Sequence, residues 1–239
     1  MQHKQMGQLA EKFRISCDRS IASLRDLHDD FACTRMLWND MLIRVTRYNE
    51  NPTVINAITG SRVEGSELAA KARSSIQRLR IRVYKDLIAQ FELFVAELLQ
   101  NWLTDKPQSL HEKSVTIRTI LSSTDLAAVQ SAAIREAVDS TVADKLFGKP
   151  EKWFRYLRTT IDPQIGSPGE EFFVEMKARR DILEHHGGIV EASYAEKAGK
   201  AARYKRGDQI ELTEADVDDA YTLVCSLVLS TTDLARRSA

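Results

Sequence analysis

The sequence has few cysteines, few prolines and glycines, no excess of charge and no long apolar run. Its three cysteines (Cys17, Cys33 and Cys225) stand far apart, which argues against a disulfide framework or a structural zinc site, and we expect them to be reduced packing residues. Basic and acidic residues number 34 each, so any site for a polyanion must be local. No segment has the roughly 18 apolar residues of a membrane span, and residues 1–14 lack a signal-peptide core. We therefore expect a cytoplasmic protein with no membrane partner.

Ten glycines and five prolines in 239 residues leave long segments free of helix breakers, which is typical of an all-α protein. The pattern predicts a bundle of long antiparallel helices over 67–239, with 1–66 as an N-terminal helical extension and linker that packs on it. The expected helices are 6–48, 67–103, 109–121, 124–148, 150–157, 168–186 and one that begins after Thr213, with breaks at 49–60 and 61–67 and an extended piece at 209–212.

Apolar stripes indicate which helix faces are buried. The first helix repeats apolar residues every seven positions from Ala10 to Val45. The strongest stripe lies in the second helix and consists of Tyr84, Ile88, Phe91, Val95, Leu98 and Trp102. Burial of each of these side chains contributes on the order of 1.5–3 kcal/mol, so we expect this helix to organise the core.

The helix at 168–186 has clear predicted boundaries. Ser167 is expected to cap it in a capping box with Glu170, and the pair Gly187-Gly188 to end it. Its two apolar faces suggest two partners. The expected core stripe is Phe172, Met176 and Leu183, and the expected interface with a second copy of the same helix is Val174 and Ala178 together with Asp181 and His185.

The last two turns of this helix carry residues suited to acid-base chemistry. Asp181 and His185 are four residues apart, so the carboxylate is expected to hydrogen-bond the imidazole and favour its charged form near neutral pH. Arg180 lies about 140° away from His185 around the helix, so one helix does not easily direct both at a single phosphate. Two copies of the helix would bring them together.

The segment from Arg180 to His185 reads R-D-x-x-x-H, and HGGIVEASY follows it from His186 to Tyr194. This resembles the motif of HEPN ribonucleases and its usual continuation. The pair Phe91-Glu92 and the segment GDQIELTEADVDDAYTLV resemble the flanking helices of that family, over roughly residues 80–235. The resemblance is closest to HEPN groups of bacterial defence and toxin systems. It implies an all-helical homodimer that cleaves RNA without metal or cofactor, with an antitoxin or defence-system protein as a possible partner.

The resemblance also implies roles for individual residues. The expected catalytic residues are Arg180, Asp181 and His185, with Glu184, His186 and Tyr194 as candidate catalytic or supporting residues. A basic run follows the motif, and the expected RNA contacts are Arg179, Lys197, Lys200, Arg203, Tyr204, Lys205 and Arg206. No metal site is expected.

Three alternatives remain open. An exposed salt bridge between Arg180 and Glu184 would explain both residues without any function. Asp181 stands where asparagine is commonest in the family, which favours a non-catalytic HEPN-like interaction module. The third alternative is a helical domain that binds a nucleotide without cleaving it.

Overall fold

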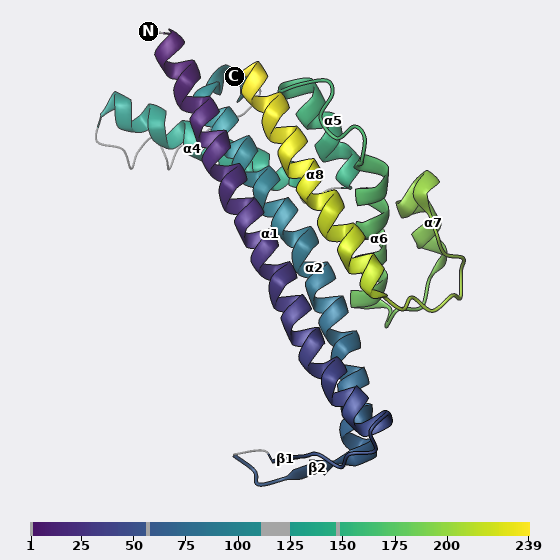
Figure 1. Ribbon diagram of the computed structural model, residues 1–239. Helices are drawn as coiled ribbons and strands as arrows, with labels where there is room; N and C mark the ends of the chain where they lie inside the picture. Colours follow the sequence, from purple (N-terminus) through teal and green to yellow (C-terminus); the bar gives the residue numbers. More distant parts are fainter. Residues whose placement is uncertain (1, 56–57, 111–124, 147–148) are drawn as a thin grey trace.

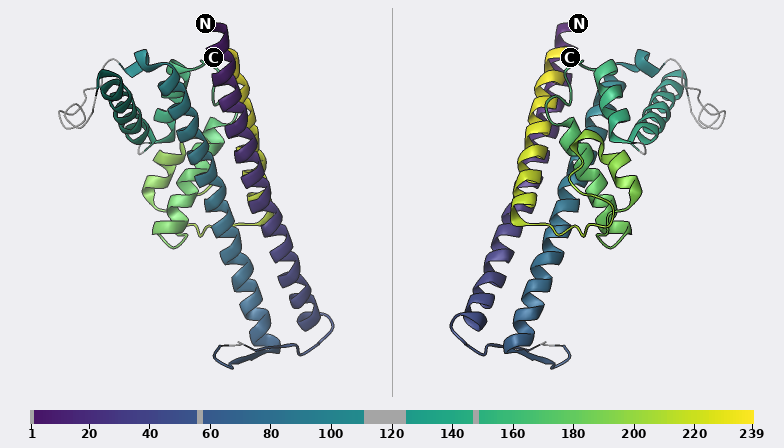
Figure 2. Two further views of the ribbon diagram at one scale, coloured as in Figure 1. Left: turned by 90° about the vertical axis from the view of Figure 1, so that its left-hand side faces the viewer. Right: turned by 90° about the vertical axis from the view of Figure 1, so that its right-hand side faces the viewer.

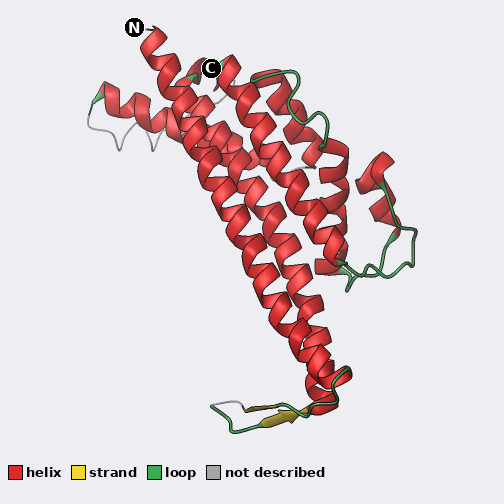
Figure 3. Cartoon of the chain, viewed as in Figure 1, coloured by secondary structure: helices red, strands yellow, loops and turns green. Residues whose placement is uncertain are grey.

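The computed structural model describes residues 2–55, 58–110, 125–146 and 149–239, and it is mostly helical. Helices α1 (Gln2–Thr46) and α2 (Gly65–Asp105) form a long antiparallel pair, and α8 (Glu214–Ser238) lies along both of them (Figure 1). The all-α class is thus confirmed in its coarse form (Figure 3). The segment expected at 109–121 lies almost entirely outside the described residues.

In chain order the shorter elements are β1 (Thr53–Ile55), β2 (Arg62–Glu64), the 3-10 helix η1 (Pro107–Leu110), α4 (Leu126–Leu146), α5 (Pro150–Thr160), α6 (Glu170–His185), α7 (Ala192–Ala198) and the 3-10 helix η2 (Gly199–Ala201). Helices α4 to α7 cover one side of the frame formed by α1, α2 and α8, and the β1–β2 hairpin lies at one end of the α1–α2 pair (Figure 2). The sequence did not predict the β1–β2 hairpin, which links α1 to α2 with Val54 opposite Val63.

Helix α1 belongs to the same hydrophobic core as the other helices. Leu24 and Phe31 of the expected heptad stripe are buried, at 0% and 2% exposure. Leu9 and Phe13 are also fully buried, and Phe13 stacks on Trp102 of α2 with ring centroids 6.3 Å apart. The N-terminal helix therefore packs on both α2 and α8.

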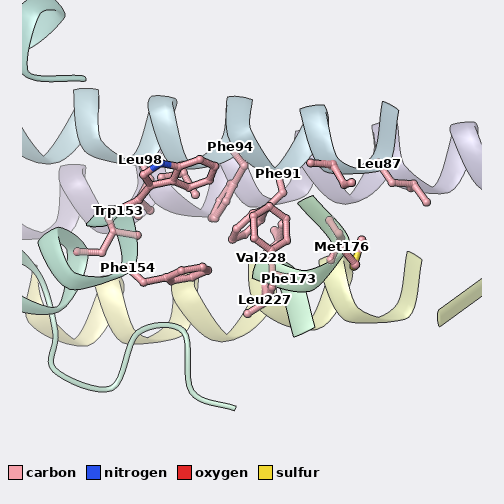
Figure 4. Packing of buried hydrophobic residues seen from close by; sticks show 14 of the residues in the cluster. Leu87, Phe91, Phe94, Leu98, Trp153, Phe154, Phe173, Met176, Leu227 and Val228 are labelled. Atoms are coloured by element: carbon pink, nitrogen blue, oxygen red, sulfur yellow. The ribbon is translucent and has the colours of Figure 1, made fainter. Parts of the chain in front are cut away.

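The core centres on α2, as expected. All six residues of its predicted stripe are buried, with exposures of 4% or less. Phe91 contacts the ring of Phe173 from α6 edge-on at 4.7 Å, and rings from α5 enclose this pair (Figure 4). Helix α2 thus fixes the position of α6, which carries the candidate motif.

Two details of α6 differ from the sequence expectation. The helix begins at Glu170, two residues late, and no capping box forms there, because the Glu170 carboxylate pairs with Arg158 instead. The expected core residue Phe172 is 53% exposed, and its neighbour Phe173 is buried in its place. Two adjacent phenylalanines fit the apolar pattern almost equally well, and only the aromatic pocket on α2 and α5 selects between them.

Other local expectations hold. Thr213 caps α8 in a capping box with Asp216. The Asp125 side chain accepts a hydrogen bond from the backbone N–H of Ala128 and so caps α4. Among the cysteines, Cys17 is buried but Cys33 is exposed, so the packing role expected for Cys33 is wrong. None of the described helices is both long and apolar enough to cross a membrane.

Candidate functional site

The motif lies on the last two turns of α6. Arg180 and Asp181 are half-buried, and His185, the last residue of the helix, is exposed. The chain then reverses through Gly187 and Gly188, which have positive φ angles of 59° and 84°. These left-handed backbone conformations favour glycine at both positions, and at Gly188 a Cβ atom would also displace the Gln209 side-chain amide, 2.4 Å away.

A pocket of about 860 Å³ opens beside the motif, between α2, α4, α5, α6 and α7. Its volume is in the usual range for small-molecule sites. The charged residues among those described that line it are Lys149, Lys152, Lys177, Arg180, Lys197, Glu92 and Asp181. Five cations thus face two carboxylates, which makes the pocket locally positive on a chain of zero net charge.

The two carboxylates hold the cations in place. Asp181 pairs with Arg180 at 3.1 Å and with the Lys197 ammonium at 3.4 Å. Glu92 pairs with Lys177 at 2.6 Å and lies 3.8 Å from the Arg180 guanidinium. Among the hydrogen bonds of the described residues, none joins Asp181 to His185. The expected orienting role of Asp181 is therefore wrong for this chain, because its oxygens face the pocket cations.

Lys177 is the most enclosed of the pocket lysines. Its ammonium lies 4.1 Å from the centre of the Trp153 ring, and its side chain is 15% exposed. Burial lowers the pKa of Lys177, although the hydrogen bond to Glu92 acts in the opposite direction. Lys177 is thus held between an indole face, a carboxylate and the neighbouring Arg180.

Glu184 and His186 are engaged elsewhere. Glu184 accepts a hydrogen bond from Lys85 of α2 at 2.8 Å, which lowers the pKa of this carboxyl group. The alternative of an Arg180–Glu184 salt bridge is therefore wrong. His186 Nδ1 lies 3.0 Å from the Glu191 carboxylate, and its ring contacts that of His185 edge-on at 6.5 Å.

A buried polar network supports the motif from behind. Arg179, at 2% exposure, donates to Glu175 at 2.8 Å and to Asp216 of α8 at 2.6 Å. The Tyr194 hydroxyl donates to the other Glu175 oxygen at 2.6 Å and accepts the backbone N–H of Arg203. Tyr194 therefore packs behind the motif, as expected. The assignment of Arg179 to RNA contact is wrong, because the guanidinium is enclosed and each of its two Nη groups donates to a carboxylate.

The basic run after the motif is only partly a loop. Lys197 lies in α7 and faces the pocket, whereas Tyr204 is half-buried against the Tyr194 ring at 6.1 Å and is not free to stack on a base. The exposed cations of the run are Lys200, Arg203, Lys205 and Arg206. The Arg203 guanidinium reaches Glu175 at 3.8 Å and so also screens the buried network.

The expected dimer face is covered in part by the chain itself. Val174 and Ala178 are 6% and 4% exposed and form the apolar floor of the pocket. Residues of α4, α5 and α7 line the same pocket around these two side chains, so the chain itself occupies part of the space that a second helix would need. Only His185 at the helix end, and Asp181 through the pocket opening, remain accessible from that face.

Comparisons with protein-family models, curated proteins and solved structures each find no match to this chain. The HEPN resemblance therefore depends on the quoted residues. Within the described ranges, no three His, Cys, Asp or Glu side chains gather as metal ligands would.

Four charged residues of the pocket were not identified from the sequence as site residues: Glu92, Lys149, Lys152 and Lys177. Lys177 is four residues before Asp181, so helical spacing alone could have placed it on the same face. Glu92 was noted only as part of an aromatic-acid pair. Lys149, at the N-cap of α5, and Lys152, within α5, carry no local signal, since their position depends on how α5 packs.

Proposed function

We propose that this chain is a metal-independent endoribonuclease with a HEPN-like helical bundle. One observation carries the proposal: Arg180 lines a positively charged pocket, while the exposed His185 lies on the same helix just outside it. Such a pocket suits a phosphodiester, and an exposed imidazole is the side chain most often used for proton transfer at neutral pH. The cytoplasmic defence or toxin context, with an antitoxin or defence-system partner, belongs to the same proposal.

In the proposed reaction the ribose 2′-oxygen attacks the adjacent phosphorus. One His185 takes the 2′-OH proton, and a second protonates the departing 5′-oxygen as the P–O5′ bond breaks. Arg180 stabilises the extra charge on the pentacoordinate phosphate. The products are a 2′,3′-cyclic phosphate and a 5′-OH, and the nucleophile belongs to the substrate. Asp181 holds Arg180 and Lys197 at the pocket and takes no proton.

We further propose that the enzyme is a homodimer with a shared site. His185 is not among the described residues that line the pocket of its own chain. A twofold contact between the C-terminal ends of two α6 helices would place each His185 at the opening of the other chain's pocket. The contact is expected at the helix ends, because the chain itself covers Ala178. An Ala178→Arg variant would therefore disturb the monomer and is not a clean test of the interface.

The first test is cleavage of total RNA by the purified protein in EDTA. We expect cleavage without added metal and fragments that end in a 2′,3′-cyclic phosphate, detected by their resistance to 3′-end ligation until acid opens the cyclic ester and a phosphatase removes the resulting monophosphate. Intact RNA under all conditions would contradict the proposal.

Nucleotide binding without cleavage is the second candidate, and the position of His185 outside the pocket favours it. The same preparation distinguishes the two functions. Saturable binding of a nucleoside triphosphate, together with intact RNA, would support the pocket as a ligand site and remove the nuclease.

A substitution at Asp181 tests its role in the pocket. Asp181→Asn removes one of the two pocket carboxylates and leaves Arg180 and Lys197 with more positive charge for a phosphate. We expect kcat/KM for RNA cleavage to be equal to or higher than that of the parent. A loss on the order of 100-fold or more would show that the carboxylate itself moves a proton. Such a result would overturn the mechanism while leaving the site in place.

A further inference from the structure

Helix α2 carries a second concentration of positive charge, outside the pocket. Between residues 68 and 85 the chain has no acidic residue and six basic ones: Lys71, Arg73, Arg78, Arg80, Arg82 and Lys85. On a chain of zero net charge this is a local excess of positive charge, and none of these six residues was predicted as a site residue from the sequence.

Four of these cations share one face of α2. The steps from Lys71 to Arg78, Arg82 and Lys85 are seven, four and three residues, which keeps them in one row about 21 Å long. We call this row the α2 basic stripe. Arg73 points away from it, and Arg80 faces Glu214 of α8.

The stripe is continuous with the candidate site. Lys85, at one end of it, bonds Glu184, the neighbour of His185. One heptad further along the same face, Glu92 lies against Arg180 and Lys177. This face of α2 is thus covered by α6 as far as His185, and beyond that point it projects toward the β1–β2 hairpin past the ends of α6 and α8 (Figures 1 and 2).

Three of the four stripe cations, Lys71, Arg82 and Lys85, each lie near one carboxylate, but the pairs of Lys71 and Arg82 are exposed. Arg78 donates to the hydroxyls of Ser74 and Ser75, and within the described chain it has no acidic partner. Arg82 is 82% exposed and lies 3.7 Å from Asp86. Lys71 pairs with Glu67 at 3.1 Å, with both side chains more than half exposed. Exposed pairs of this kind contribute about 0–1 kcal/mol, so a phosphate can replace the carboxylate at little cost.

The stripe also has a shape suited to phosphates. Arg78, Arg82 and Lys85 surround a hollow of about 240 Å³ with Ile81 and Asp86. No aromatic side chain lies on the stripe, since the nearby Tyr84 is fully buried. Binding of single strands commonly uses base stacking on aromatic rings, whereas double-stranded RNA is recognised by shape and backbone contacts. A straight row of cations without rings therefore favours a duplex backbone.

We propose that the α2 basic stripe binds the paired stem of a structured RNA and directs the adjoining unpaired strand to His185. The inference rests on the proposed ribonuclease function for its substrate. It adds the class of RNA: a stem next to an unpaired segment. Contacts of this kind are independent of sequence and depend strongly on salt.

The test is a binding measurement on a chain that cannot cut. In a His185→Ala background, Lys71, Arg78 and Arg82 are all replaced by Gln, which leaves Lys85 and its bond to Glu184 intact. The probes are a fluorescent hairpin RNA with a single-stranded tail and the tail alone, followed by anisotropy over a range of salt concentrations. The control variant removes the same charge at three exposed positions outside the stripe, Lys12, Arg73 and Arg155.

We expect the stripe variant to bind the hairpin on the order of 10- to 100-fold more weakly than the control at low salt, with a log–log salt slope reduced by about 0.7–0.9 per cation removed. Affinity for the tail alone is expected to be unchanged. Equal hairpin affinity in the two variants would overturn the inference, and so would an equal loss for the tail alone. A stripe variant that loses its dimer in light scattering would also overturn it, since the stripe would then face a second copy.

The experiment distinguishes failure of the stem-binding inference from failure of the ribonuclease proposal. If the chain with His185 intact cuts neither RNA but the stripe variant loses hairpin binding, the ribonuclease proposal fails and the stripe remains a stem-binding surface. If that chain cuts RNA and the stripe variant binds the hairpin as the control does, the nuclease stands and the stripe inference fails.

Discussion

Replacing His185 with alanine is expected to lower the rate of RNA cleavage about 10²- to 10⁴-fold, the usual contribution of general acid-base catalysis. The side chain is exposed at the last position of α6, and no hydrogen bond between His185 and another described side chain is present. Its removal therefore leaves the core and the pocket unchanged, and the loss should appear in kcat. Helical content and mass in solution are expected to equal those of the parent.

The matched control is Glu171→Ala, which removes an exposed polar side chain from the first turn of the same helix. It is expected to cleave RNA at the parent rate, because it lies nearly four turns from His185. A His185→Ala chain that cleaves as fast as this control would remove His185 from the mechanism. The remaining candidate for the proton transfer would then be His186, whose ring lies beside it.

Periodicity predicted the fold well wherever one stripe was much more apolar than its alternatives. On α2 every stripe residue is buried, because large apolar side chains recur at a spacing that only one helix face satisfies. On α6 the apolar pattern fitted burial of Phe172 and burial of Phe173 almost equally well. The choice of Phe173 over Phe172 depends on rings contributed by α2 and α5. Such long-range packing has no counterpart in a local pattern.

In the candidate site, the motif residues were predicted from the local sequence, but their ionic partners come from helices distant in the sequence. The motif pointed to Arg180 and Asp181, and both line the pocket, but helical spacing could not show that Glu92 and Lys197, from other helices, would pair with them. The hydrogen bond expected between Asp181 and His185 was plausible from spacing alone. It does not form, because stronger cationic partners arrive from elsewhere in the fold.

Arg179 is the residue for which sequence and structure disagree most, and its replacement is expected to have a large effect on stability. Arg179→Ala leaves Glu175, at 1% exposure, with only the more distant and more exposed Arg203 at 3.8 Å, and it removes a partner of Asp216. Breaking one side of a buried ion pair costs about 3–5 kcal/mol, because the remaining charge stays in a medium of low dielectric constant. We expect the urea midpoint of unfolding to fall accordingly, at unchanged slope.

The matched control is Arg14→Ala. Arg14 also pairs with two carboxylates, Glu11 at 2.5 Å and Asp18 at 2.7 Å, but its side chain is 48% exposed and water screens both pairs. Its loss is expected to leave the urea midpoint of unfolding nearly unchanged. The difference between the two variants therefore measures the effect of burial, since the number of ionic partners is the same.

A double variant separates the lost ion pair from the charge left behind. Glu175→Gln with Arg179→Met removes both charges and keeps an oxygen that can accept the Tyr194 hydroxyl hydrogen bond. It should recover much of the stability lost in Arg179→Ala, because no buried charge then remains unpaired. If Arg179→Ala instead unfolds like the parent while its affinity for RNA falls, the guanidinium is a substrate contact, as the sequence first indicated. The structural role assigned here to Arg179, as the buried partner of Glu175 and Asp216, would then be wrong.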